Sequence, residues 1–345
     1  MGAERIEVTR ESSMAVYDRQ LRNPPPGPLV PFRPPRENAY TVDGRDIVAV
    51  VRADSRREGI EEALRLMGGV EPLVRGVNGE IVIKPNCNTD DPFPRDTHPD
   101  TVRTIVERLT STGFPSHRIV LGETSGRGRG LPTRHTLGNL GMLEAAEELG
   151  IAVCCFEEDE WVTVKPPTSR AWPDGIKIPR RIHEADRVIL TPIMRPHSNA
   201  HFTISLKLAV GMLDSAGREW LHNGEAFHDK QVELNLAYSA DLVIADATKI
   251  LVDKELTPSK AAEPGIIIAS GNRVASDAVC VALMKQHGVD RVSDRPVLRQ
   301  EQFAICERLG LGSPRLEKME LRTSNVAGDG GFGDLISGIE EELGG

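Results

Sequence analysis

Aromatic side chains are scarce in this sequence, at 4% of residues, so the core has to rest on valine, isoleucine, leucine and alanine. Positive charge is also in deficit. The net charge of −9 argues against a protein that wraps nucleic acid, because neutralising phosphates needs a basic face. No stretch approaches the roughly eighteen consecutive apolar residues of a membrane-spanning helix. The N-terminal residues are mixed and polar, without the charged-then-apolar order of a secretory signal. We therefore expect a cytoplasmic protein with neither a nucleic-acid nor a membrane partner.

The cysteines of the sequence do not have the number or spacing of a disulfide framework or a metal site. The five cysteines are odd in number, two of them are vicinal, and no C-x-x-C pair occurs. They are Cys87, Cys154, Cys155, Cys280 and Cys306. This excludes a disulfide framework and a zinc or iron–sulfur module, so we expect no iron–sulfur cluster and a reducing compartment.

Short apolar runs do recur along the chain, separated by amphipathic segments. They lie at 46–51, 80–86, 118–123, 151–156, 186–192, 241–247 and 265–270. Strands that are apolar almost throughout and alternate with helices are typical of a parallel sheet buried on both faces. The predicted fold class is α/β, with a mainly parallel sheet covered by helices on both faces and two lobes that enclose a cleft.

The domain boundaries are predicted from changes in composition. Residues 1–40 include a proline-rich stretch and are expected to form an extended arm. Residues 41–236 form a first α/β lobe that carries the site, and residues 237–345 form a second lobe with a glycine-rich tail, mobile or draped on the surface. Alternating valines and prolines at 161–178 indicate a small antiparallel insertion.

The first group of candidate site residues follows the strand at 80–86. Lys84 and Asn86 end this strand, and Thr97 and His98 precede Pro99. Proline suits the first position of a helix, which makes His98 the predicted N-cap. There its ring lies beside free backbone N–H groups, a place that attracts anions and keeps an imidazole neutral. The alternative is a plain capping histidine on a surface loop.

The second group is denser and follows the strand at 186–192. Lys207 is the only charge in the helix-like, otherwise apolar stretch 203–213, so it either snorkels outward or points into a polar site. In a desolvated site its pKa would fall, and it could act as a base or nucleophile. Arg195, His197, His201, Arg218 and His222 lie close by in the sequence. The i, i+4 spacing of His197 and His201 could place two imidazoles on one helical face as metal ligands.

Carboxylates and hydroxyls follow other strands. Glu123 and Ser125 open the loop LGETSGRGRG at 121–130, where we expect them to contact the substrate. Asp246 ends one strand, Asp277 opens a helix, and each is as readily a structural cap as a site residue.

The motifs IVIKPN, THP, LGETSG, EADRVILTP, SLKLAVGM, DLVIADAT and ASGNRVASDAV, in this order, resemble the domain-of-unknown-function family 362 (DUF362). The likeness runs from about residue 46 to 285, and the S-L-K-x-x-x-G segment is its most specific part. Many members of that family carry a ferredoxin-like iron–sulfur module, for which this chain has no cysteine pattern. Arg195 and Leu208 stand where the family usually has lysine and asparagine.

The spacing of His197, Lys207 and His222 is also similar, more distantly, to that of the nickel-pincer lactate racemase family. This resemblance implies that Lys207 is the cofactor tether or a substrate-binding cation and that His222 is the metal ligand. It also implies that His98 and His197 are the acid–base pair. The chain has Pro99 where that family has an arginine, and it lacks the glycines that flank the family's lysine.

The predicted function is acid–base chemistry at a carbon of a small, carboxylate-bearing anion, such as isomerisation, epimerisation or elimination. His98, His197, Lys207 and His222 are the predicted catalytic residues. Lys84, Asn86, Thr97, Glu123, Ser125 and Arg195 are the predicted substrate-binding residues. One alternative is a mononuclear hydrolase or oxygen-dependent enzyme whose nickel, iron or zinc is held by His197, His201 and His222. Another is a small-molecule-binding protein without turnover. A homodimer is a candidate assembly.

Overall fold

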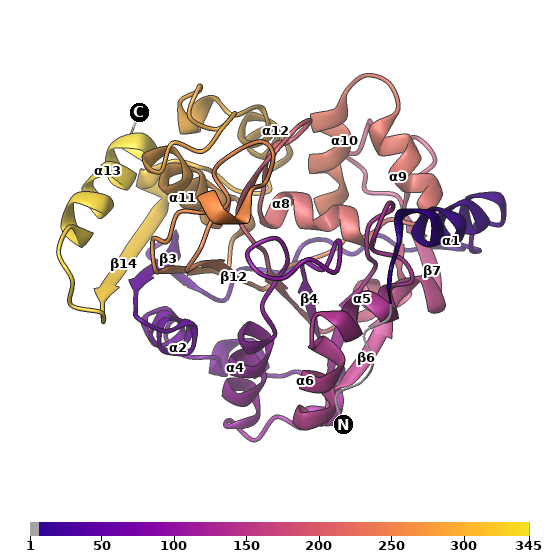
Figure 1. Cartoon of the computed structure of the whole chain (residues 1–345), viewed down its shortest axis with the longest axis horizontal. Helices are drawn as coiled ribbons and strands as arrows, with labels where there is room; N and C mark the ends of the chain where they lie inside the picture. The colour runs from indigo at the N-terminus through magenta and orange to yellow at the C-terminus, as the bar shows by residue number, and fades with distance from the viewer. Residues whose placement is uncertain (1–6, 345) are drawn as a thin grey trace.

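The computed structural model describes residues 7–344, and within them the chain is organised around a nine-stranded sheet (Figure 1). Across the sheet the strands are β14 (Met319–Asn325), β3 (Arg45–Arg52), β13 (Ile266–Ser270), β12 (Leu242–Ala247), β9 (Arg187–Thr191), β4 (Ile81–Pro85), β5 (Ile119–Glu123) and β6 (Ala152–Cys155), with β2 (Thr41–Val42) paired to β3. Only β13 and β2 run antiparallel to their neighbours in this sheet. The predicted α/β class with a mainly parallel sheet is confirmed.

Both faces of the sheet are covered, because alternate residues of each strand face opposite cores. In β3, Ile47, Ala49 and Val51 enter one core, while Val48 and Val50 enter the other. Figure 1 shows α2, α4 and α6 on one side of the sheet and α8, α10 and α11 on the other. The helices of the first face are α2 (Arg56–Met67), α3 (Glu71–Val74), α4 (Pro99–Thr110), α5 (Thr133–Asn139) and α6 (Met142–Leu149). Those of the second are α7 (Arg180–Glu184), α8 (Ser205–Leu208), α9 (Ser215–His222), α10 (Phe227–Glu233), α11 (Arg273–Gln286), α12 (Glu301–Leu309) and α13 (Phe332–Gly344). Burial on two sides explains why the strands are apolar throughout rather than in alternation.

Strands from the two predicted lobes interleave in this sheet. β3 comes from the first predicted lobe, yet it lies between β14 and β13 of the second. The predicted division after residue 236 therefore does not correspond to two separate sheets. Local composition cannot reveal such an order, because it is decided by pairings between distant segments.

The N-terminal arm crosses the surface, as its prolines predict, but it begins with a helix that the sequence did not suggest. Helix α1 (Arg10–Arg22) starts at a capping box made by Thr9 and Ser12. Beyond it, β1 (Leu29–Val30) pairs in parallel with β7 (Trp161–Val164), which pairs antiparallel with β8 (Ile176–Pro179). The predicted antiparallel insertion is confirmed. Residues 1–6 of the predicted arm lie outside the described residues.

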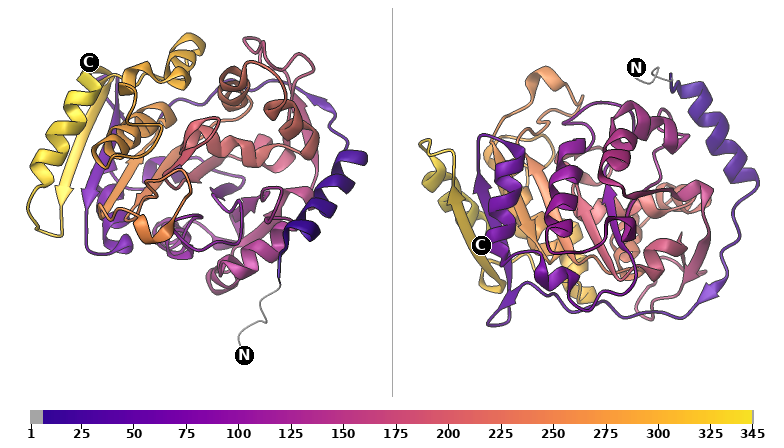
Figure 2. Two further views of the ribbon diagram at one scale, coloured as in Figure 1. Left: turned by 45° about the horizontal axis from the view of Figure 1, so that its top comes forward. Right: turned by 90° about the horizontal axis from the view of Figure 1, so that it is seen from below.

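The C-terminal tail is packed rather than loose, so that prediction is wrong. Helix α13 buries Leu335, Ile339 and Leu343 at helical spacing against the second core, where it contacts α11. Figure 2 shows the N-terminal helix and the C-terminal helix at opposite ends of the sheet. No helix among residues 7–344 has the length and apolar character needed to cross a bilayer.

Candidate functional site

Two neighbouring strands of the sheet send their connections to opposite faces. After β4 the chain passes through α4, whose buried side chains join the first core, and returns as β5. After β9 it passes through α8, α9 and α10 on the other face and returns as β12. Such a point opens a crevice beyond the carboxyl ends of the strands, where ligands bind in open α/β sheets.

A cavity of about 50 Å³ lies at this crevice. Its polar lining includes Lys84, Asn86, Glu123, Arg195, Lys207 and Arg218. Four of the six predicted substrate-binding residues line this cavity, whereas Thr97 and Ser125 do not. Three strand ends and two helices supply these side chains, as the spacing of polar residues after apolar runs predicts.

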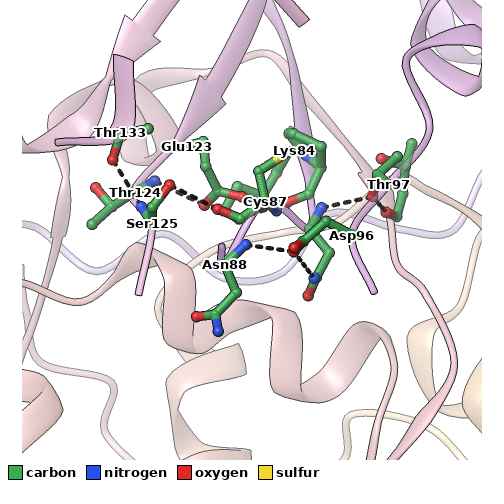
Figure 3. A network of polar contacts seen from close by, with 12 residues as sticks. Lys84, Cys87, Asn88, Asp96, Thr97, Glu123, Thr124, Ser125 and Thr133 are labelled. Carbon is green, nitrogen blue, oxygen red and sulfur yellow. Dashed lines mark hydrogen bonds and ion pairs between the residues drawn. The ribbon is translucent and has the colours of Figure 1, made fainter. Parts of the chain in front are cut away.

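One buried charge pair belongs to the lining of this cavity, and Figure 3 labels both of its members, Lys84 and Glu123. The Lys84 ammonium lies 2.5 Å from a carboxylate oxygen of Glu123, and both side chains are buried. Glu123 also accepts hydrogen bonds from the backbone N–H groups of Cys87 and Thr124, each at 2.8 Å. Burial raises the pKa of Glu123, and the neighbouring Lys84 charge counteracts that shift. Gly211 packs against this ion pair: a Cβ at Gly211 would lie 2.8 Å from Lys84 Nζ.

A second buried network holds the turn after β4 in shape, as Figure 3 also shows. Asp96 accepts hydrogen bonds from the Asn86 side-chain amide at 3.0 Å and from the Asn88 backbone N–H at 2.7 Å. The Thr97 hydroxyl accepts from the Asn86 backbone N–H and donates to the Thr191 carbonyl at 2.7 Å. Burial raises the pKa of Asp96 to about 7. Thr97 thus positions the turn, whereas Asn86 both supports it and lines the cavity.

Ser125 is also used internally. Its hydroxyl donates to the Cys87 carbonyl at 2.7 Å, and its backbone N–H donates to Thr133 Oγ1. The backbone carbonyls of Ser125 and Thr124 accept hydrogen bonds from the Arg218 guanidinium at 2.6 and 2.8 Å. Ser125 is not among the lining residues, so its contribution is to hold Arg218 and the loop after β5.

Two cations of the lining have no direct hydrogen-bond or ion-pair partner among the described residues. Within residues 7–344 neither the Arg195 guanidinium nor the Lys207 ammonium makes a hydrogen bond or an ion pair, and Arg195 Nε is buried without a partner. Arg195 is only 8% exposed. Burial lowers the pKa of Lys207 to about 7, with further lowering from the Arg195 and Arg218 charges. Arg195 is buried and Lys207 is half-buried. Cations without a direct partner are costly in such a place, so their presence here points to an anion from outside the chain.

A carboxylate from another helix holds the short helix that carries Lys207. Asp277 on α11 accepts hydrogen bonds from the Ser205 N–H at 3.0 Å, from the Leu206 N–H at 2.9 Å and from the Ser205 hydroxyl. Asp277 is fully buried, and burial raises its pKa to about 7. Of the two roles open to Asp277 from the sequence, the structure selects the cap, here supplied across space to α8.

His197 and His222 are electrostatically coupled to Lys207, and their hydrogen bonds fix opposite tautomers. His197 Nδ1 accepts from the Asn199 and Ala200 N–H groups at 3.2 and 3.1 Å, so its proton is on Nε2. His222 Nδ1 lies 2.8 Å from the Arg218 carbonyl, so it donates and leaves Nε2 as an acceptor. Burial and the Lys207 charge lower the pKa of His197 to about 2, and burial also lowers that of His222. Neither ring is among the residues that line the cavity.

His98 is the N-cap of α4, as predicted, but it faces a different cavity. Its Nδ1 accepts from the Asp100 N–H at 3.1 Å, and its ring packs edge-on against Phe93. The cavity that it lines has a volume of about 840 Å³ and includes Arg52 and Arg56, but neither Arg195 nor Lys207. The structure therefore does not bring His98 into the small cavity with Lys207.

The predicted histidine metal site is not assembled. His197 and His201 lie opposite each other in a hairpin of β10 (Arg195–His197) and β11 (His201–Thr203), so the helical spacing assumed for them is wrong. The His201 ring lies 5.1 Å from the ring of His228, away from Lys207. Among residues 7–344 no three His, Cys, Asp or Glu side chains form a group that could hold a metal ion. The donor set of this site therefore does not fit a three-histidine metal centre.

The family model described as "Domain of unknown function (DUF362)" matches residues 81–282. This chain belongs to the DUF362 family. The match confirms the resemblance drawn from the motifs, and it encloses the whole lining of the small cavity.

Similarity to other known proteins is more limited. No curated protein matches the sequence. Among solved structures, the chain is similar to the lactate racemase apoprotein from Thermoanaerobacterium thermosaccharolyticum, with 16% identity and a TM-score of 0.41. The similar region covers 61% of this chain and 52% of that one, which is about half its length. The function of this DUF362 protein has to be argued from its own side chains.

Proposed function

We propose that this DUF362 protein is an enzyme that moves protons at a carbon of a small, carboxylate-bearing anion, in an isomerisation, epimerisation or elimination. One observation carries the proposal: Arg195 and Lys207 line a cavity at the switch point of the sheet, and among residues 7–344 neither makes a hydrogen bond or ion pair to a carboxylate. A substrate carboxylate supplies the missing charge, since a guanidinium presents a planar set of donors that matches a carboxylate.

The same cations support the chemistry. Removing a proton from a carbon next to a carboxylate places further negative charge on the carboxylate oxygens. Fixed cations in a site that excludes water stabilise that developing charge most strongly. Arg218 adds to this field, because its hydrogen bonds go to backbone carbonyls and none goes to a carboxylate.

The proton carriers are the groups that titrate near neutral pH or stay neutral there. Lys207, with a pKa of about 7, can give or take a proton at working pH. His222 has a free acceptor at Nε2, so it can accept a proton, and neutral His197 can donate a hydrogen bond from Nε2 to a substrate oxygen. Lys207 and His222 are therefore the assigned base candidates, protonated Lys207 is the assigned acid, and His197 is a hydrogen-bond donor.

Hydrogen–deuterium exchange tests this proposal without knowledge of the product. The protein is incubated in D₂O with single 2-hydroxy, 2-oxo and unsaturated carboxylates, and the loss of carbon-bound proton signals is followed by NMR. We expect exchange with at least one substrate class, and Lys207→Met is expected to slow it by about 100-fold or more. The matched control is Lys165→Met, which removes an exposed lysine remote from this cavity. Exchange that is unaffected by Lys207→Met and by His222→Gln would refute the assignment.

Anion binding without turnover is the second candidate. It is favoured by the observation that neither His197 nor His222 lines the cavity. It predicts that carboxylates bind and raise the melting temperature, that no carbon-bound proton exchanges, and that Lys207→Met lowers affinity only.

A further inference from the structure

The charges around the small cavity also indicate how many negative charges the bound anion carries. Building on the proposed function, we propose that the substrate anchored between Arg195 and Lys207 carries at least two negative charges close together, as a short dicarboxylate or a phosphate-like group does.

The charges of the lining do not balance. Lys84 is matched by Glu123, the one carboxylate among the lining residues, at 2.5 Å. Arg195 and Arg218, together with Lys207 in its protonated form, then face the cavity region with no lining carboxylate left. A single substrate carboxylate would leave most of this positive charge uncompensated in a buried place, which is costly.

The groups behind the lining do not remove the excess. Asp96 is the acidic group that acts most strongly on Arg195, but it makes no hydrogen bond to it, and its own hydrogen bonds go to the turn after β4. Burial raises the pKa of Asp96 to about 7, so it carries only part of a charge at neutral pH. The carboxylates that act on Arg218 are Glu123, Glu157 and Asp214, and none of them hydrogen-bonds to it. Glu123 is paired with Lys84 and Asp214 with Lys177 at 2.9 Å, while burial raises the pKa of Glu157.

The size of the cavity limits how the two charges are arranged. About 50 Å³ accommodates one compact acidic group, since a water molecule in the liquid occupies about 30 Å³. The second charge therefore lies on the same group, as in a phosphate, or one or two carbon atoms away at the mouth, as in a short dicarboxylate.

Pairs of isosteric anions that differ only in charge test the inference directly. Isothermal titration calorimetry at pH 7 on the full chain compares sulfate with methanesulfonate, and malonate with malonamate. We expect the dianion to bind at least about tenfold more tightly than its monoanionic partner in at least one pair, because it gains one charge-assisted contact. A preference within the sulfate pair identifies a phosphate-like group, and one confined to the malonate pair identifies a dicarboxylate.

Variants assign the preference to this cavity. Lys207→Met and Arg195→Met should each reduce the preference to about threefold or less, whereas the control Lys165→Met should keep it. Calorimetry at pH 8 in two buffers of different ionisation enthalpy gives a second signal: the dianion should bind with uptake of a proton in the wild type but not in Lys207→Met.

The inference is overturned if both members of each pair bind within about twofold of each other in the wild type, or if neither member binds. It is also overturned if the preference survives both substitutions. None of these results depends on proton exchange at carbon, so the proposed activity and this inference can fail separately.

Discussion

The position of Lys207 depends on Asp277, and this dependence has a measurable size. Asp277→Ala leaves the N–H groups of Ser205 and Leu206 and the Ser205 hydroxyl without their acceptor in a fully buried place. Each unsatisfied group costs about 1–3 kcal/mol before relaxation, so we expect a loss of about 3 kcal/mol in the free energy of unfolding. Asp277→Asn keeps one acceptor oxygen and should cost about 1 kcal/mol. Urea titration followed by circular dichroism measures both.

The pH dependence of the free energy of unfolding, compared between the wild type and Asp277→Asn, gives a sharper test. In the folded protein the pKa of Asp277 is raised to about 7 by burial, above its ordinary value of 3.8. Between these values the folded state holds the proton more tightly than the unfolded chain, so this group makes the wild type less stable as pH rises. Asp277→Asn lacks the group, so the stability advantage of the wild type over this variant should shrink between about pH 4 and 7. A loss under about 1 kcal/mol for Asp277→Ala would refute the capping argument, and a wild-type advantage that grows over this pH range would refute the raised pKa of Asp277.

Three further outcomes are expected. Gly211→Ala should weaken anion binding by about tenfold and lower the free energy of unfolding by about 1–2 kcal/mol. The alanine Cβ would lie 2.8 Å from Lys84 Nζ and would push the ammonium away from Glu123. Calorimetry measures the first effect and urea unfolding the second. Dianion affinity should fall by up to about tenfold per pH unit above pH 7, where Lys207 loses its proton, and Lys207→Arg should flatten this profile. Ile339→Ala should cost about 2–4 kcal/mol in urea unfolding, and an unchanged midpoint would contradict the packing of α13.

The strands can be predicted from the sequence because a strand buried on both faces is a short run of apolar residues. Runs such as 241–247 and 265–270 are apolar regardless of which strands flank them, so their existence and type can be predicted one at a time. Their order across the sheet cannot, which is why the division after residue 236 has no counterpart in the sheet. The tail was misjudged because its glycines precede a helix whose apolar spacing begins only at Leu335.

The candidate site shows the same division between local and distant information. Lys207 stood out as a lone charge in an apolar stretch, and the structure gives it a cavity with Arg195. The i, i+4 spacing of His197 and His201 fits one helical face, but the two residues pair across a hairpin. Pro196 is the local signal for this, because proline favours extended backbone at the residue that precedes it, Arg195. The sequence alone does not mark Gly211 as a residue that the Lys84–Glu123 pair requires. The S-L-K-x-x-x-G segment contained the signal, but only the approach of Lys84 from another strand explains it.

The placement of β3 has a consequence for how the chain reaches its native state during synthesis. This strand is synthesised well before its neighbours β13 and β14, and the Ser270 hydroxyl donates to the Ile47 carbonyl across 223 positions of sequence. Until then both long edges of an apolar strand are open to other chains. Nascent protein should therefore be vulnerable to misassembly and depend on chaperones, and any truncation before β14 should yield aggregates.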